Sequence, residues 1–282
     1  MNRYLELTKP RITLFILMST GVGFLFGTHL GKPWTWMELF HTLLGTMLIA
    51  GGTAALNQWY EREGDGLMNR TKARPIPSGR ITADHALTFG TALSAAGFSE
   101  LWLGANLLTA LLALFTLASY LFVYTPLKRV SPISTTIGAI PGAMPPLIGY
   151  AAATGHLNYE AGILFAILFL WQFPHFYAIA WMYREDYARA GIRMLPVVEA
   201  TVDSTSRRIV WFSMALIPMS LAPKFFDMAG NFYLFGASVL GTIMLYAGFQ
   251  ANSTQTRLQA RRVLLASVLY LPLLYGLMAL DS

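Results

Sequence analysis

The chain has 282 residues, of which 55% are hydrophobic and only 12% are charged, about half the charged share of an ordinary soluble domain. This composition argues against a soluble enzyme and indicates a bilayer as solvent, in which we expect one integral membrane domain over residues 1–282. The absence of cysteine excludes disulfides, thiolate metal sites and a cysteine nucleophile, so histidine, carboxylate and basic side chains must carry any chemistry.

Continuous nonpolar stretches recur along the whole chain, each close to the length that crosses a bilayer as a helix. They lie near residues 12–30, 37–59, 84–104, 107–124, 133–153, 158–182, 209–226, 231–250 and 263–280. The sequence therefore predicts an all-α, polytopic membrane protein of nine transmembrane helices.

The basic residues fall mostly on one side of that topology. Eighteen of the 20 Lys and Arg residues lie at the N-terminus and in every second connection, and only Lys32 and Lys224 lie on the other side. Cytoplasmic loops are enriched in Lys and Arg, so we expect a bacterial inner-membrane protein with a cytoplasmic N-terminus and a periplasmic C-terminus. Topology thus explains the net charge of +6 without nucleic acid.

Lys9 and Arg11 precede the first span; the pair could reach a diphosphate, but we favour the interpretation that both only set the orientation. At the end of the second span, Asn57, Glu61 and Asp65 follow one another at helical spacing, which places three oxygen ligands on one helix face. Such a set suits Mg²⁺, which takes one or two carboxylates and completes its shell with water and phosphate. The alternative is an ordinary cytoplasmic loop whose acids offset its basic residues.

The long cytoplasmic connection at residues 60–83 then supplies Arg70, Lys72 and Arg74. Guanidinium groups bind phosphate through two parallel hydrogen bonds, so metal ligands followed by these cations fit a phosphorylated substrate. Lys128 and Arg129, after the fourth span, are two more cations that could reach a diphosphate or only set the orientation.

Prolines and glycines cluster at residues 125–149, and they predict a kink in the fifth span. Pro174 should bend the sixth span, and His175, Tyr183 and Asp186 should share one face of that helix. His175 is either functional or a hydrogen-bonded structural residue. The long connection at 183–208 resembles the one at 60–83, which hints at two related halves.

These motifs together resemble the UbiA superfamily of intramembrane prenyltransferases, and specifically its protohaem IX farnesyltransferase branch. The resemblance covers most of the chain. It rests on Leu7 to Ile12, Asn57 to Ile81, Tyr124 to Arg129, Gly138 to Gly149, Pro174 to Phe176 and Asp186 to Val198. In place of a second Asp-x-x-x-Asp motif the chain has Tyr183-x-x-Asp186-Tyr187, the form of the haem branch.

The resemblance implies nine helices around a central cavity, with a polar cytoplasmic cap. It implies that Asn57, Glu61 and Asp65 hold Mg²⁺ on farnesyl diphosphate with the help of Asp186, and that His175 or Tyr183 orients haem or a water molecule. Glu61 stands where Asp is common, and Arg193 where the branch often has Pro. Residues expected to bind the substrates are Arg70, Arg74, Tyr124, Lys128, Arg129, Tyr187 and Arg193.

The reaction implied is transfer of a farnesyl group from farnesyl diphosphate to a vinyl group of protohaem IX. Addition of water then gives haem O, which a haem A synthase or a terminal oxidase would receive. One alternative keeps the fold and prenylates an aromatic quinone precursor. The others, from different classes, are a membrane transporter and a haem-binding assembly factor without catalysis.

Overall fold

The structure is a computed structural model that describes residues 3–28 and 34–282. These residues form helices and contain no strand, which confirms the all-α prediction for the described part of the chain. Lys32 and His29 lie outside the described residues. The N-terminal half contains α1 (Arg3–Leu7), α2 (Pro10–Thr28), α3 (Trp36–Tyr60), α4 (Arg62–Leu67), α5 (Ala83–Gly104), α6 (Leu107–Ala118), the π-helix η1 (Ser119–Tyr124) and α7 (Thr125–Leu127).

The second half of the chain repeats this mixture of long and short helices. It contains α8 (Ser134–Gly142), α9 (Pro145–Thr154), α10 (Tyr159–Met182), α11 (Arg184–Arg189), α12 (Leu195–Val198), α13 (Asp203–Phe225), α14 (Asn231–Thr254) and α15 (Arg257–Leu280). The connections 60–83 and 183–208, expected from sequence to be loops, therefore hold three short helices, α4, α11 and α12.

Six helical segments of the described chain are long and apolar enough to cross a membrane. They are α2, α3, α6 with its continuation to Leu127, α10, α14 and α15. The three other predicted spans coincide with α5, with α8 and α9 together, and with α13. The structure thus confirms a membrane protein, while nine spans remain a prediction.

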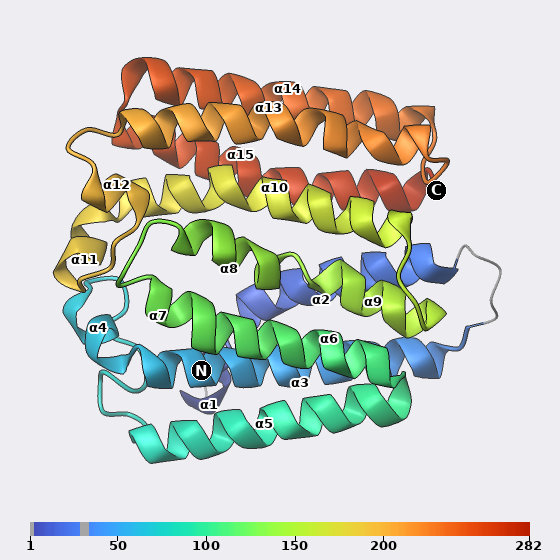
Figure 1. Ribbon diagram of the computed structural model, residues 1–282, viewed down its shortest axis with the longest axis horizontal. Coiled ribbons are helices and arrows are strands. Elements are labelled where there is room, and N and C mark those ends of the chain that lie inside the picture. The colour runs from blue at the N-terminus through green and yellow to red at the C-terminus, as the bar shows by residue number, and fades with distance from the viewer. Residues whose placement is uncertain (1–2, 29–33) are drawn as a thin grey trace.

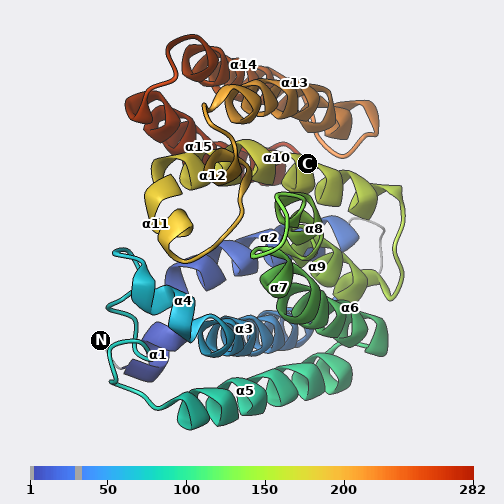
Figure 2. The same cartoon turned by 60° about the vertical axis from the view of Figure 1, so that its left-hand side comes forward.

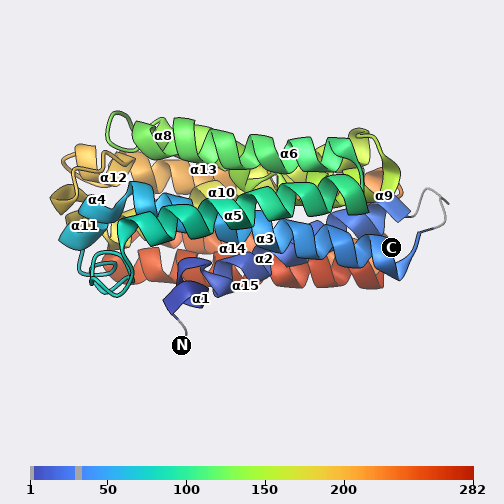
Figure 3. The same cartoon turned by 90° about the horizontal axis from the view of Figure 1, so that it is seen from below.

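The long helices lie side by side, and three of the short ones, α4, α11 and α12, gather at one end (Figure 1). In Figures 1 and 3, α4, α11 and α12 share the left-hand end of the bundle, whereas the C-terminus lies at the right-hand end. Figure 2 shows α3 and α5 on one side of the molecule and α13, α14 and α15 on the other, with α10 between them. The charged connections of the two halves therefore meet at one end of the bundle.

Glycine permits very close approach between neighbouring helices, α2 with α9 and α3 with α5. A Cβ atom added to Gly149 of α9 would lie 1.8 Å from the backbone oxygen of Thr20 in α2. One added to Gly97 of α5 would lie 2.5 Å from the backbone nitrogen of Ile49 in α3. Helices in a bilayer associate through such backbone contact, because lipid tails remove the hydrophobic drive between them.

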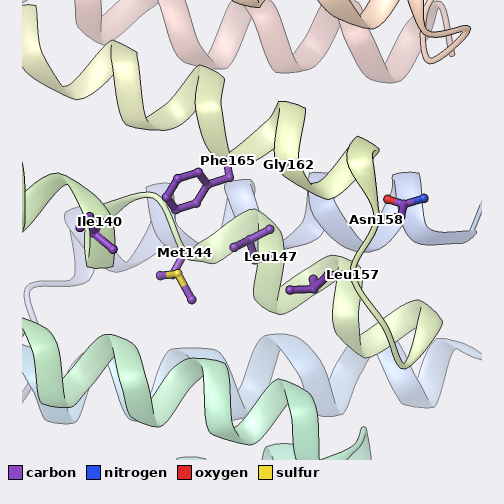
Figure 4. A pocket seen from close by; sticks show the side chains of 7 residues that line it. All are labelled: Ile140, Met144, Leu147, Leu157, Asn158, Gly162 and Phe165. Carbon is purple, nitrogen blue, oxygen red and sulfur yellow. The ribbon is translucent and has the colours of Figure 1, made fainter.

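The fifth predicted span is broken rather than merely kinked, since α8 ends at Gly142 and α9 begins at Pro145. Gln172 of α10 donates from Nε2 to the carbonyl oxygen of Ala139, 3.0 Å away, and so satisfies a carbonyl near the break. Gly142 is required there, because a Cβ would lie 1.9 Å from Gln172 Oε1. Beside the break lies a largely apolar groove (Figure 4), lined by Ile140, Met144, Leu147, Leu157, Asn158, Gly162 and Phe165.

Replacing Gly149 by alanine tests the packing of α2 on α9. The added methyl has no room against the Thr20 carbonyl, and overpacking of this kind costs about 1–3 kcal/mol of folding free energy. We expect the thermal unfolding midpoint in detergent to fall. Gly162→Ala is the matched control, because a Cβ at that helical position meets no atom within 4 Å. An equal loss in both variants would contradict the packing argument.

Candidate functional site

The three predicted oxygen ligands lie where α3 passes into α4. Helix α3 ends at Tyr60, and Glu61 joins it to α4 with φ −90° and ψ 5°. The backbone N–H of Glu61 donates to the Asn57 carbonyl at 2.9 Å, and that of Asp65 donates to the Glu61 carbonyl at 2.8 Å. Helical spacing thus continues through the junction, and it keeps the three side chains in register.

Asn57 and Glu61 are joined in a chain of hydrogen bonds between two ammonium groups. Asn57 Nδ2 donates to Glu61 Oε2 at 2.8 Å, while Asn57 Oδ1 accepts a hydrogen bond of 3.0 Å from Lys9. The second carboxylate oxygen of Glu61 accepts from Lys128 at 2.9 Å. The amide oxygen of Asn57 and both carboxylate oxygens of Glu61 therefore each accept a hydrogen bond, and the same oxygens could coordinate a metal ion.

Lys128 reaches Glu61 from the opposite side of the site. Its ammonium lies 4.4 Å from the ring centre of Tyr124 and 5.8 Å from that of Tyr120, within cation–π range. Burial opposes its charge, but Glu61 outweighs burial and raises the pKa of Lys128 well above its usual range. Burial likewise works against the Glu61 carboxylate, but Lys128 holds its pKa below the usual range. Both groups are therefore charged at neutral pH.

Asp65 is as enclosed as Asn57, with 1% of its surface exposed. Arg74 donates to Oδ2 at 2.6 Å, but Oδ1 is buried without a hydrogen-bond partner among the described residues. A buried carboxylate oxygen without a donor is costly, and a cation would satisfy it.

The donor set fits magnesium. Two carboxylates and one amide oxygen are hard ligands, and Mg²⁺ usually takes only one or two carboxylates beside phosphate and water. No group of three His, Cys, Asp or Glu side chains in the described residues could hold a metal ion without further ligands. The unpartnered oxygen of Asp65 supports the amide-containing set instead.

The predicted continuous face of the sixth span is wrong. Helix α10 ends at Met182, and Tyr183 adopts φ −115° and ψ 23° before α11 begins at Arg184. Asp186 therefore lies on a separate short helix and not on α10 with His175. The Tyr183 N–H still donates to the Ile179 carbonyl at 3.1 Å, and the Tyr187 N–H donates to the Tyr183 carbonyl at 3.0 Å, so this junction resembles the one at Glu61.

Asp186 joins the two charged connections to each other. Its carboxylate accepts from the backbone N–H groups of Asn69 and Arg70, at 3.4 and 3.2 Å, and from the side chain of Arg189. The guanidinium of Arg70 lies 5.2 Å from the Tyr183 ring centre and donates to the Tyr187 hydroxyl at 3.3 Å. Side chains of the second half thus position the phosphate-binding loop predicted in the first half.

The remaining predicted residues fall into two groups. Arg129 lies beside Gly64 of α4, because a Cβ atom added to Gly64 would lie 3.2 Å from Arg129 Nη2. The Arg193 backbone N–H donates to the Lys128 carbonyl at 2.7 Å. His175 lies elsewhere, bonded through Nδ1 to Ser267 of α15 at 2.8 Å and stacked on Trp171. The structure therefore brings Arg129 and the backbone of Arg193 to the site, but not His175.

Sequence reasoning missed three contributors to this site. Lys9 was interpreted as an orientation signal, but it contacts Asn57, and burial together with the positive charge of Arg74 lowers its pKa to about 7. Tyr120 lies beneath Lys128, and Thr125 accepts from Asn57 Nδ2 at 3.4 Å. The motif of Lys followed by Pro at the start of a span was the available signal for Lys9.

Comparison with known proteins gives one consistent result. The sequence profile of the UbiA prenyltransferase family matches residues 16–272. The protoheme IX farnesyltransferase of Solibacter usitatus is 62% identical over 288 residues, covering 100% of this chain and 99% of its own length. That of Koribacter versatilis is 48% identical and covers 99% of this chain and 92% of its own length.

Solved structures show the same fold at much lower sequence identity. A digeranylgeranylglyceryl phosphate synthase superposes with a TM-score of 0.81 at 18% identity, covering 99% of this chain and 97% of its own. A UbiA homologue from Archaeoglobus fulgidus, solved with GPP and Mg²⁺, gives a TM-score of 0.66 at 17% identity and covers 99% and 100% of the two chains. These likenesses establish a UbiA-like arrangement of helices.

Asp186→Ala should loosen the segment that follows α4. The substitution leaves two backbone N–H groups and a guanidinium without their acceptor, and each lost bond of this kind costs about 1–3 kcal/mol. We expect faster tryptic cleavage after Arg70 and Lys72 in detergent. The exposed neighbour Glu185 supplies the control as Glu185→Ala. Unchanged cleavage in the Asp186 variant would show that the carboxylate does not hold this segment.

Proposed function

The chain belongs to the UbiA prenyltransferase family, and we propose that it transfers a farnesyl group from farnesyl diphosphate to a vinyl group of protohaem IX. The relatives at 62% and 48% identity carry the name of that activity and match nearly the full length of this chain. Addition of water to the transferred product, giving haem O with release of diphosphate, belongs to the same proposal.

The observation that carries the proposal is the buried, unpartnered Oδ1 of Asp65 beside Asn57 and Glu61. Each of these oxygen-bearing side chains contacts a basic one: Arg74 pairs with Asp65, Lys128 pairs with Glu61, and Lys9 donates to Asn57. Metal ligands and cations in one place are what a diphosphate requires. A transporter or a haem carrier would have no use for this combination.

We assign the metal to Asn57, Glu61 and Asp65, with Asp186 in a supporting place. Bound there, Mg²⁺ would neutralise the negative charge that develops on the departing diphosphate. Asp186 supports the site through the backbone of Asn69 and Arg70, to which both of its oxygens are bonded.

The cationic residues have separate tasks in this proposal. Lys128, held protonated by Glu61 and flanked by Tyr124, binds a phosphate oxygen and stabilises the leaving group. Arg70, resting on Tyr183 and Tyr187, presents its guanidinium from the other connection. Arg74 and Arg129 complete the phosphate-binding set, and we assign the exposed Arg193 side chain to a haem propionate.

The allylic carbon then meets an electron-rich vinyl group of protohaem in a site from which bulk water is kept out by the surrounding helices. The cation that forms beside the porphyrin takes up water and releases a proton, which gives a hydroxyethyl-farnesyl side chain. We assign to Tyr183, at the edge of the site, or to His175, inside the bundle, the task of orienting haem or that water.

The proposal includes a topology. Nine spans surround a central cavity, the end with α4, α11 and α12 faces the cytoplasm of a bacterial cell as a cap, and the C-terminus is periplasmic. The distribution of Lys and Arg supports this orientation. Haem O would leave through the bilayer toward a haem A synthase or a terminal oxidase.

The decisive experiment incubates purified protein in detergent with protohaem, farnesyl diphosphate and Mg²⁺, and then analyses extracted haem by mass spectrometry. Haem heavier by one farnesyl group and one hydroxyl group supports the proposal. Prenylation of an aromatic quinone precursor instead would keep the enzyme class and change the acceptor. No reaction with either acceptor would bring the transporter and assembly-factor interpretations forward.

Asp65→Asn should abolish most of the activity. The substitution removes one negative charge from the metal site, and a loss of about 3 kcal/mol of transition-state stabilisation lowers the rate ~100-fold. We expect added Mg²⁺ to restore part of the rate. Glu63→Gln is the control on the same short helix, because the Glu63 side chain is 81% exposed. Similar rates in both variants would remove Asp65 from the metal site.

A further inference from the structure

Lys9 is held in an unusual backbone conformation between α1 and α2. Its φ of 48° lies in the left-handed region that residues other than glycine rarely adopt. Its N–H donates to the Glu6 carbonyl, and its own carbonyl accepts from Ile12 and Thr13. The chain thus keeps a strained lysine at the start of α2, and this conformation directs the side chain toward α3.

The partner of the Lys9 ammonium is a neutral oxygen. Nζ donates to Asn57 Oδ1 at 3.0 Å, and among the described residues Lys9 forms no ion pair. Lys128, on the other side of the same cluster, has the Glu61 carboxylate and two tyrosine rings. Lys9 is half-buried and its direct contact is an amide oxygen, while the Glu61 and Asp65 carboxylates act on it only from farther away. A bound anion would give it a direct partner of opposite charge.

The atom that Lys9 contacts is also the one that a metal would need. Asn57 turns its Nδ2 toward Glu61 and Thr125, so Oδ1 is its only ligand atom. We infer that Lys9 competes with the divalent metal for Asn57 Oδ1, and that it transfers its hydrogen bond to a diphosphate oxygen when metal and diphosphate bind together. This inference rests on the proposed function only in taking a diphosphate as the anion.

The inference makes Lys9 a positioning residue with two opposite effects. Before diphosphate binds, the Lys9 amino group covers one ligand atom, and in its protonated form it also repels the metal, so binding of the metal alone is disfavoured. After diphosphate binds, the same charge pairs with phosphate and favours the complex. Metal would then stay in the site chiefly together with substrate. A residue that only supported the fold would move both affinities in one direction.

The test measures two affinities on the full chain in detergent, neither of which depends on catalysis. Mn²⁺ alone is titrated and followed by its electron paramagnetic resonance signal, and inorganic diphosphate is then titrated calorimetrically at saturating Mn²⁺. In Lys9→Met we expect Mn²⁺ alone to bind at least about tenfold more tightly and diphosphate at least about tenfold more weakly, the size of one charge-assisted hydrogen bond.

Two further variants make the test specific. Arg11→Met removes an exposed charge two residues away and should leave both affinities unchanged. Lys9→Arg keeps the charge and should hold diphosphate affinity within about threefold of wild type. It also serves where Lys9→Met does not fold, as judged by its thermal midpoint: equal loss of both affinities in Lys9→Arg would overturn the inference.

In Lys9→Met, weaker binding of metal and diphosphate together, or no change in either, would also overturn the inference. Failure of the proposed function gives a different pattern. In that case wild-type protein would not convert protohaem, while the opposite shifts of the two affinities in Lys9→Met would still be seen.

Discussion

The site depends on charges balancing one another where water is scarce. Lys9, Asn57, Glu61 and Lys128 form one chain of hydrogen bonds at the end of the bundle, so neither ammonium is left without an acceptor. An ion in such surroundings is stable only when others compensate it. The helices that carry these residues, the start of α2, the end of α3 and the turn after α7, are therefore fixed relative to each other by the same charges that would bind substrate. Glu61 suits this task, because its two oxygens serve Asn57 and Lys128 separately.

The two halves of the chain solve one structural problem in the same way. Helix α3 turns at Glu61 into α4, and α10 turns at Tyr183 into α11, with six residues in each short helix. The turns redirect the chain across the end of the bundle, and there Asp186 of α11 accepts from the backbone that follows α4. This agrees with the two related halves expected from sequence. It also explains why one half can carry the oxygen ligands while the other positions the cationic loop.

Much of this was predictable from sequence, because membrane helices are encoded by composition over about twenty residues. Helix α3 was expected at 37–59 and is found at Trp36–Tyr60, and the spacing of Asn57, Glu61 and Asp65 survives in the backbone hydrogen bonds. Events at single residues were not predictable. The break at Tyr183 depends on one pair of backbone angles, and the separation of α8 from α9 depends on Gln172 reaching the Ala139 carbonyl from another helix. Lys9 was missed because its role requires a long-range contact with Asn57.

Asp186 shows why residue identity alone does not define a role. In sequence it is an acidic residue near the predicted diphosphate site, and a metal ligand is the natural interpretation. In the structure one of its oxygens accepts from the Arg70 N–H and the other from Asn69 and Arg189. The carboxylate of Asp186 thus holds the backbone of the segment after α4, which carries the arginines proposed to bind phosphate. Asp65, with one oxygen bonded to Arg74 and the other without a partner among the described residues, has the free coordination that a metal ion needs. In the proposed assignment, Asp186 holds the loop and Asp65 holds the ion.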